Sequence, residues 1–237
     1  MQEGKNPNSQ PQTIRAMNTR LALTATLTAS LTQLAHAGVL VITNPGFESP
    51  ATATVSSNIP DGWTANGATG GYWNINAFPA GFWNVPAPEG NQVGYVVSSG
   101  ESGPGSLAQT LSDSLQANTR YTLSGMVGHP VGYGATRDPD TVFGIDLRAG
   151  GNILASTSGI APEGSFQPFE LVFDSAGSPF IGQPLEIRLF SSQPQTAYDA
   201  IQLIAVPEPE HYVAMCGAAL GAFGLLLRTR RQAGVSS

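Results

Sequence analysis

Residues 120–127 read Arg-Tyr-Thr-Leu-Ser-Gly-Met-Val, and this stretch decides the fold class. Tyr121, Leu123 and Val127 share one face of an extended chain, because side chains alternate along a strand with a period of two. Polar residues between them suit the opposite, solvated face. No segment nearby shows a convincing helical repeat. The stretch therefore predicts a β-strand with one buried face.

The same alternation recurs through residues 38–205, which we take as one domain. It is clearest in three further stretches, at residues 141–148, 169–173 and 185–189. Other expected strands cover residues 39–43, 92–97, 106–111, 152–157 and 198–205. Residues 149–152, Ala-Gly-Gly-Asn, predict a hairpin turn. About nine short strands at this spacing predict an all-β, antiparallel sandwich.

Composition supports this fold class and excludes some functions. The chain of 237 residues has 28 glycines, 18 prolines and only 11% charged residues, which is typical of a turn-rich β protein. Residues 38–206 contain 4 arginines and 13 acidic residues, a formal charge of 4 − 13 = −9. Such a domain repels polyanions, so a nucleic-acid partner is not expected. Cys216 is the only cysteine, which leaves the domain without a disulfide or a cysteine metal cluster.

The N-terminal residues predict a signal peptide at 17–37. Residues 17–20 carry a basic charge, residues 21–34 are modestly apolar, and Ala35-His-Ala37 forms a cleavage site of the Ala-x-Ala type. Residues 1–16 precede Met17 and are interpreted as a mis-assigned upstream extension. A short amphipathic helix is the alternative for the apolar part.

The C-terminal residues predict a membrane-spanning helix. Residues 212–227 are uncharged, close to the minimum length that spans a bilayer. The basic cluster that follows consists of Arg228, Arg230 and Arg231. Basic residues stay on the cytoplasmic side, so the domain is expected to face outward. Residues 232–237 form a short tail.

Pro207-Glu208-Pro209 stands directly before this apolar run. The order of motif, helix and arginine cluster over residues 206–231 resembles the PEP-CTERM sorting signal. That resemblance implies an exosortase-type membrane protease as partner. It also implies passage through the inner membrane to the cell surface or the extracellular polysaccharide matrix. A plain C-terminal anchor after a proline-rich linker is the alternative.

The domain itself resembles the carbohydrate-binding-module-like jelly rolls of the galactose-binding-like superfamily. The matching stretches are Thr43–Glu48, Gly62-Trp63, Pro88–Tyr95, Ser106–Leu111, Thr119–Ser124 and Tyr198–Leu203. The resemblance implies a jelly-roll sandwich. Many members hold a structural Ca²⁺ where the first and last strands meet, which carries over to Glu48 and Asp199. Backbone hydrogen bonding by these two carboxylates is the alternative.

All three tryptophans fall between Trp63 and Trp83 in a segment rich in Gly, Asn and Ala. Trp63 matches a family position that is usually structural, so we expect it in the core. Trp73 and Trp83 are candidates for a platform that stacks on sugar rings. Aromatic residues that pin a long loop to the core are the alternative.

These features predict a non-catalytic exported protein whose domain binds glycan. Two other functions stay open at this point. One is a structural or adhesive surface protein without glycan binding, and the other is a secreted polysaccharide hydrolase. No pair of carboxylates is placed by the sequence for glycoside hydrolysis, and no GxSxG motif is present.

Overall fold

The computed structural model describes residues 38–67, 70–77, 81–98, 105–132, 142–191 and 195–208. These residues form strands β1 to β12, and this described part contains no helix. The predicted signal peptide and C-terminal helix, including Ala35, Ala37, Pro209 and the arginine cluster, lie outside the described residues. Within the described ranges, no helix is long and apolar enough to cross a membrane.

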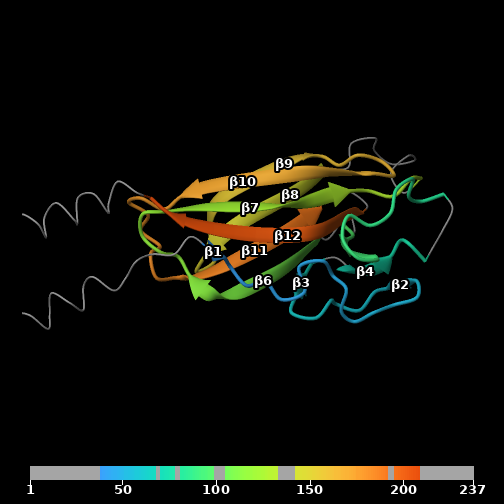
Figure 1. Ribbon diagram of the computed structural model, residues 1–237, viewed down its shortest axis with the longest axis horizontal. Helices are drawn as coiled ribbons and strands as arrows, with labels where there is room; N and C mark the ends of the chain where they lie inside the picture. Colours follow the sequence, from blue (N-terminus) through green and yellow to red (C-terminus); the bar gives the residue numbers. More distant parts are fainter. Residues whose placement is uncertain are drawn as a thin grey trace, which may run out of the picture. The chain divides into compact units, whose positions relative to one another are not determined.

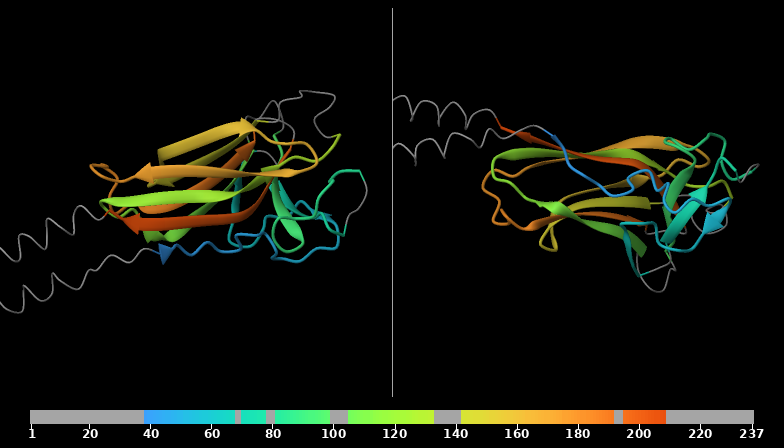
Figure 2. Two further views of the ribbon diagram at one scale, coloured as in Figure 1. Left: turned by 45° about the horizontal axis from the view of Figure 1, so that its top comes forward. Right: turned by 60° about the horizontal axis from the view of Figure 1, so that its bottom comes forward.

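The strands form two antiparallel sheets, seen as two layers in Figures 1 and 2. Sheet A contains β1 (Gly38–Val39), β2 (Val55–Ser56), β4 (Gly70–Asn74), β5 (Gln92–Val96), β7 (Thr119–Gly128), β10 (Phe166–Asp174) and β12 (Thr196–Pro207). Sheet B contains β3 (Thr64–Asn66), β6 (Gly105–Ser114), β8 (Val142–Ala149), β9 (Asn152–Ile160) and β11 (Pro184–Ser191). The order is β10-β7-β12-β5-β4-β2 in sheet A, with β1 beside β12, and β3-β6-β11-β8-β9 in sheet B.

The predicted all-β sandwich of antiparallel sheets is confirmed. β7 and β11 bury mainly one face because their apolar residues alternate with polar ones, whereas β8 is buried along most of its length. The predicted hairpin joins β8 to β9, and Gly150 and Gly151 take φ values of 55° and 83° in its turn, which favour glycine. β2, β3 and β4 were not predicted, since all three are short and β3 and β4 lie in the segment rich in Gly, Asn and Ala.

The main hydrophobic core lies between the two sheets. Tyr198 of β12 crosses it, and its hydroxyl lies 3.2 Å from the carbonyl oxygen of Gly144 and 2.5 Å from that of Phe190, both in sheet B. Trp63 is 5% exposed in this core, as predicted, with its ring 5.0 Å from that of Phe47. These contacts identify the inner face of sheet A as structural.

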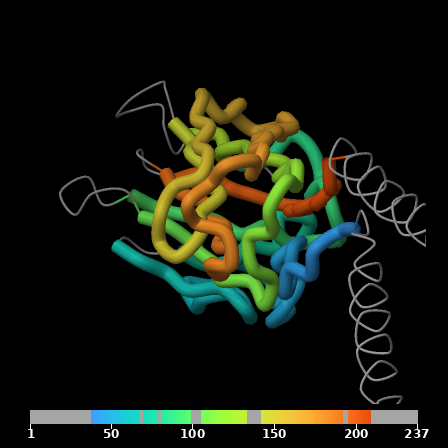
Figure 3. Tube along the Cα trace, turned by 90° about the vertical axis from the view of Figure 1, so that its left-hand side faces the viewer, coloured from blue at the N-terminus to red at the C-terminus, as the bar shows by residue number. Residues whose placement is uncertain are grey.

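The strand register brings both ends of the described domain to one end of the sandwich. Gly38 of β1 pairs with Ala205 of β12, and Pro207 pairs with Thr119. Figure 3 views the sandwich from this end, with β1 in blue beside the last strand in red. β4 and β5 pair with each other at the opposite end of β12, near Thr196.

Candidate active site

Asp199 is held on the outer face of sheet A, the face turned away from sheet B. Tyr198 points inward, so strand alternation directs Ala197 and Asp199 outward. The pairing of β12 with β7 shifts register between Asp199 and Gln202, which marks a β-bulge. Ala200 in this bulge has a φ of 52°, an uncommon conformation for a residue with a Cβ. Backbone strain of this kind clusters at functional sites.

The Asp199 carboxyl is fully buried and has two backbone partners. Its Oδ2 accepts a hydrogen bond from the Glu89 N–H at 2.8 Å, and its Oδ1 accepts one from the Ala200 N–H at 2.7 Å. Burial, with smaller contributions from the nearby charges of Glu89 and Glu48, nevertheless raises the pKa of Asp199 to about 8. At neutral pH the group is therefore a neutral carboxylic acid that can donate a proton.

The loop at residues 43–49 places Glu48 beside the same segment as Asp199. Asn44 and Phe47 have positive φ values of 53° and 58°, and the Asn44 side chain accepts the Ser49 N–H at 3.0 Å. This tight turn buries Phe47 and directs Glu48 toward residues 89–92.

Glu48 Oε1 accepts hydrogen bonds from the N–H groups of Asn91 and Gln92, each at 2.7 Å. The predicted pair, Glu48 and Asp199, is thus gathered around one loop, and its carboxylates bond to backbone N–H groups as the alternative proposed. Carboxylate oxygens suit a hard cation such as Ca²⁺. Among the described residues, however, no group of three or more acidic, His or Cys side chains is arranged to hold a metal.

A second hydrophobic cluster covers the outer face next to Asp199. We call it the aromatic cluster, and it consists of Trp73, Ile75, Val93, Tyr95 and Ala197 with Phe82, Trp83, Ala87, Val97 and Phe166 packed on it. Trp73 is 4% exposed and lies in β4, opposite Val93 of β5. Ala197 belongs to the cluster and lies two residues before Asp199 on the same face, about 6.6 Å away along the strand.

The predicted exposed sugar platform at Trp73 and Trp83 is therefore wrong. Trp73 packs edge-on against Phe82 at 5.5 Å and against Trp83 at 6.1 Å. Trp83 stacks on Phe166 with ring centroids 4.6 Å apart and an interplanar angle of 5°. Trp73 contacts other rings rather than solvent, because it lies in β4, where the sequence suggested a loop. Trp83 is partly buried against the same rings.

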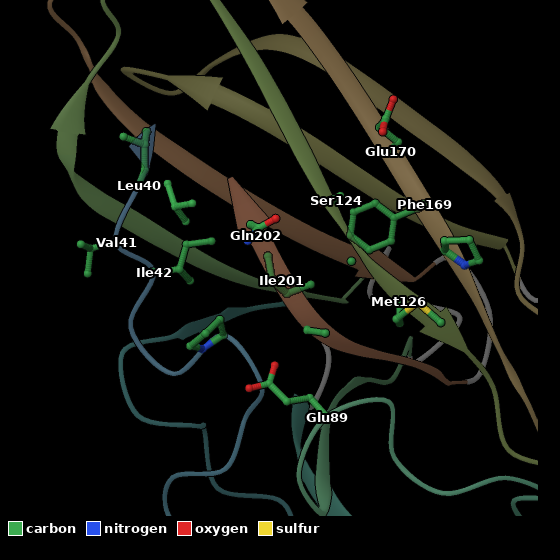
Figure 4. A pocket seen from close by; sticks show the side chains of 15 residues that line it. Leu40, Val41, Ile42, Glu89, Ser124, Met126, Phe169, Glu170, Ile201 and Gln202 are labelled. Carbon is green, nitrogen blue, oxygen red and sulfur yellow. The ribbon is translucent and has the colours of Figure 1, made fainter. Parts of the chain in front are cut away.

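A groove of about 1010 Å³ is bordered by Ala200, the residue that follows Asp199, although Asp199 itself does not line it (Figure 4). The segment at residues 39–42 forms one wall, and β7, β10 and β12 supply the rest. Its apolar lining includes Leu40, Ile42, Met126, Phe169 and Ile201, and its carboxylates are Glu89 and Glu170. Ala200 and Glu89, the two backbone donors to Asp199, both border the groove. An acid thus lies between an apolar groove and an aromatic cluster.

The sequence analysis singled out Asp199 but predicted it to be a ligand of a structural Ca²⁺. It missed the groove, because residues of β7, β10, β12 and the N-terminal segment meet only in the folded chain. One signal for an acid was present: Asp199 is a single charge in a strand whose other described residues include buried Tyr198, Ile201 and Leu203. A carboxylate there is either paired or neutral.

Solved structures similar to this chain include cyclases from the genus Fischerella. The Stig cyclase FisC from Fischerella sp. TAU, in complex with (3Z)-3-(1-methyl-2-pyrrolidinylidene)-3H-indole, is 28% identical with a TM-score of 0.64, covering 73% of this chain and 99% of that chain. A Fischerella sp. TAU cyclase bound to 4-(1H-indol-3-yl)butan-2-one is 27% identical with a TM-score of 0.64, covering 72% and 98%. An apo cyclase from Fischerella sp. is 27% identical with a TM-score of 0.65, covering 72% and 97%. No curated protein sequence matches this chain.

The profile of a protein family agrees with these structures. The family is described as HpiC1 cyclase, and its profile matches residues 39–204, which is most of the domain. The prediction of a non-catalytic glycan-binding protein is therefore wrong, as are its adhesive and polysaccharide-hydrolase alternatives. The prediction failed because a single buried acid forms no recognisable sequence motif with a second catalytic residue. From its profile match, the chain belongs to the HpiC1-like cyclase family.

Proposed function

We propose that this protein is a cyclase that acts on an indole-bearing small molecule, with the Asp199 carboxyl as proton donor. Family membership and the indole compounds bound to the Fischerella cyclases support the reaction class and the ring system. The observation that carries the proposal is the neutral, fully buried Asp199 between the groove and the aromatic cluster.

The chemistry follows from the state of this acid. Transfer of the Asp199 proton to a double bond of the substrate leaves a cation on the substrate and a carboxylate on the protein. An electron pair of a second double bond then attacks the cation and forms the new carbon–carbon bond of the ring. Return of a proton from the cyclised cation to Asp199 restores the acid, so the net reaction is an isomerisation.

The surroundings of Asp199 suit such a cation. Aromatic faces attract positive charge, and the cluster beside Asp199 includes Trp73, Tyr95 and Phe166. The apolar groove offers space for the remainder of the substrate and keeps water from quenching the cation. Ligand pockets of this type are mainly apolar with few polar groups.

The test uses purified protein and an indole that carries an alkene side chain. We expect a cyclised product of unchanged mass in H₂O. In D₂O the product should carry deuterium, because the donated proton exchanges with solvent. Asp199→Asn should lower the rate at least about 100-fold, the usual contribution of a general acid. The matched control is Asp174→Asn, which changes an exposed carboxylate paired with Arg120.

Two results would contradict the acid role. One is a fully active Asp199→Asn variant, and the other is a product without deuterium. Absence of any cyclised product from the wild-type protein across a panel of such indoles would contradict the substrate class.

As the alternative to a neutral Asp199, we propose a calcium ion between Glu48 and Asp199, which would keep Asp199 ionised and exclude its role as proton donor. Carboxylate oxygens are suitable ligands for such an ion, and both carboxylates bond to N–H groups of residues 89–92. Such an ion would hold the loop at residues 43–49 against residues 89–92 and would replace some of the backbone hydrogen bonds on these carboxylates.

Export and sorting remain a separate proposal. The signal peptide and the PEP-CTERM-like tail support it, and so does the position of Gly38 beside Ala205. The jelly-roll assignment likewise stays a proposal, supported by the two antiparallel sheets. Mass spectrometry of the exported protein should find a start near Gly38 and loss of most residues after Val206. Recovery of only a full-length, membrane-embedded chain would contradict sorting.

A further inference from the structure

Trp83 lies on a short surface segment that crosses the aromatic cluster. We call residues 81–87 the strap. Its backbone is held by three hydrogen bonds: the Val131 N–H to the Phe82 oxygen at 2.8 Å, the Asn84 N–H to the Gly164 oxygen at 2.8 Å, and the Ala87 N–H to Asn76 Oδ1 at 3.0 Å. The backbone of the strap is therefore fixed on both sides of Trp83, so Trp83 can leave the sheet only by rotation of its side chain.

The Trp83 side chain is an indole held as a bound aromatic ligand would be. One face stacks on Phe166 at 4.6 Å and 5°, and Trp73 meets it edge-on at 6.1 Å and 73°. Small residues lie on the adjoining strands, where Gly128 of β7 pairs with both Ala197 of β12 and Phe166 of β10. Removal of the Trp83 ring would leave a flat slot on the same sheet face as Asp199.

The fit of Trp83 in this slot is incomplete. Its Nε1 is buried and has no hydrogen-bond partner among the described residues, which costs free energy. The core tryptophan, Trp63, differs in this respect, because its Nε1 donates to the Asn44 oxygen at 3.2 Å. Trp83 is also only partly buried. Its retention in the slot is therefore weaker than that of a core tryptophan.

We propose that Trp83 occupies the slot for the indole ring of the substrate, and that the substrate displaces Trp83 when it binds. This inference rests on the proposed function, because it takes the substrate to be an indole. Trp83 then acts as a plug that keeps the slot dry between turnovers and selects for planar bicyclic rings. The apparent affinity for the substrate is the intrinsic affinity multiplied by the fraction of molecules in which Trp83 has left the slot.

The test measures binding of 4-(1H-indol-3-yl)butan-2-one by calorimetry to the full chain and its variants. Trp83→Ala empties the slot, so the affinity should increase about 10-fold or more over wild type. Phe180→Ala is the matched control, since it removes an aromatic ring that packs against the main core far from the strap. It should leave the affinity unchanged. Equal or weaker binding by Trp83→Ala would overturn the plug.

A second measurement covers the case in which Trp83→Ala fails to fold. Acrylamide quenching of tryptophan fluorescence in the wild-type protein should rise on ligand binding, because the displaced Trp83 becomes exposed. The rise should disappear in Trp83→Phe. Unchanged or reduced quenching in the wild-type complex would overturn the proposal. Wild-type turnover with no gain in Trp83→Ala affinity would refute the plug alone, whereas a gain without turnover would refute the proposed cyclase.

Discussion

Tyr198 and Asp199 are neighbours on β12, and each points to a different face of sheet A. Tyr198 points into the core and bonds to carbonyl oxygens of sheet B, while Asp199 points outward and bonds to N–H groups of a loop and a bulge. Burial raises the pKa of both side chains. For the tyrosine this only maintains the neutral form it already has at pH 7. For the aspartate it changes the form present at pH 7.

The inner and outer faces of sheet A therefore serve different purposes. The inner face packs against sheet B and contributes to the stability of the fold. The outer face carries a strained bulge, a neutral acid, a groove and an aromatic cluster with an unpartnered indole nitrogen among the described residues. Several rules of local consistency are broken on the outer face, which is where function is expected.

The largest expected difference between the faces concerns tryptophan removal. Trp63→Ala should lower the free energy of unfolding by about 3–5 kcal/mol, since it deletes a core ring and leaves a cavity. Trp83→Ala should lower it by less than about half that amount, because its ring is partly exposed. Urea denaturation of both variants measures this. Equal losses would mean that the outer cluster is a second core rather than a ligand site.

The next effect is a pH dependence confined to the outer face. Burial raises the folded-state pKa of Asp199 from 3.8 to about 8, so between these values the folded chain holds a proton that the unfolded chain releases. The stability that the protonated Asp199 contributes is fully present below about pH 4 and is lost as the pH rises toward 8. At pH 7 the free energy of unfolding should be lower by an amount on the order of 4 kcal/mol.

Asp199→Asn removes this ionisation. The difference in free energy of unfolding between Asp199→Asn and wild type should therefore change by several kcal/mol between pH 4 and 8. Denaturant melts across this pH range provide the measurement, with Asp174→Asn as control. A constant difference between Asp199→Asn and wild type would show that Asp199 is not held neutral.

Removal of calcium tests whether Glu48 and Asp199 on the outer face bind an ion. If Glu48 and Asp199 share Ca²⁺, saturation at about 100 times Kd stabilises the folded chain by about 2.7 kcal/mol. A chelator should then lower the melting temperature, and Glu48→Ala should abolish that shift. Bound calcium would also remove the pH dependence expected above, because a cation keeps Asp199 ionised. Identical melting curves with and without chelator would leave only the backbone hydrogen bonds.

The smallest effect concerns the inner face. Tyr198→Phe removes the hydroxyl that contacts Gly144 and Phe190, which should cost about 1–2 kcal/mol. Because the tyrosine is neutral at all pH values of interest, this loss should not vary between pH 4 and 8. Melts of Tyr198→Phe beside Asp199→Asn would check this. A pH-dependent loss would mean that the two faces are coupled through β12.

The sequence by itself determined the sandwich and most of its strands. Alternating residues such as Tyr121, Leu123 and Val127 bury one face wherever the strand lies, so a local pattern is enough. The Gly150-Gly151 hairpin and the core position of Trp63 followed from equally local chemistry and family resemblance. Asp199 was singled out by the family resemblance alone.

Only the tertiary structure decided what Asp199 does. Its neutral state depends on burial between a groove and an aromatic cluster whose parts come from residues 39–42, β4, β5, β7, β10 and the strap. These segments are distant in the chain, and pKa shifts by desolvation depend on how they close around one carboxyl. Trp73 shows the same limit, since a residue that looks exposed in a glycine-rich stretch became buried once β4 paired with β5. Local pattern determines which face a side chain takes, and long-range packing determines what surrounds it there.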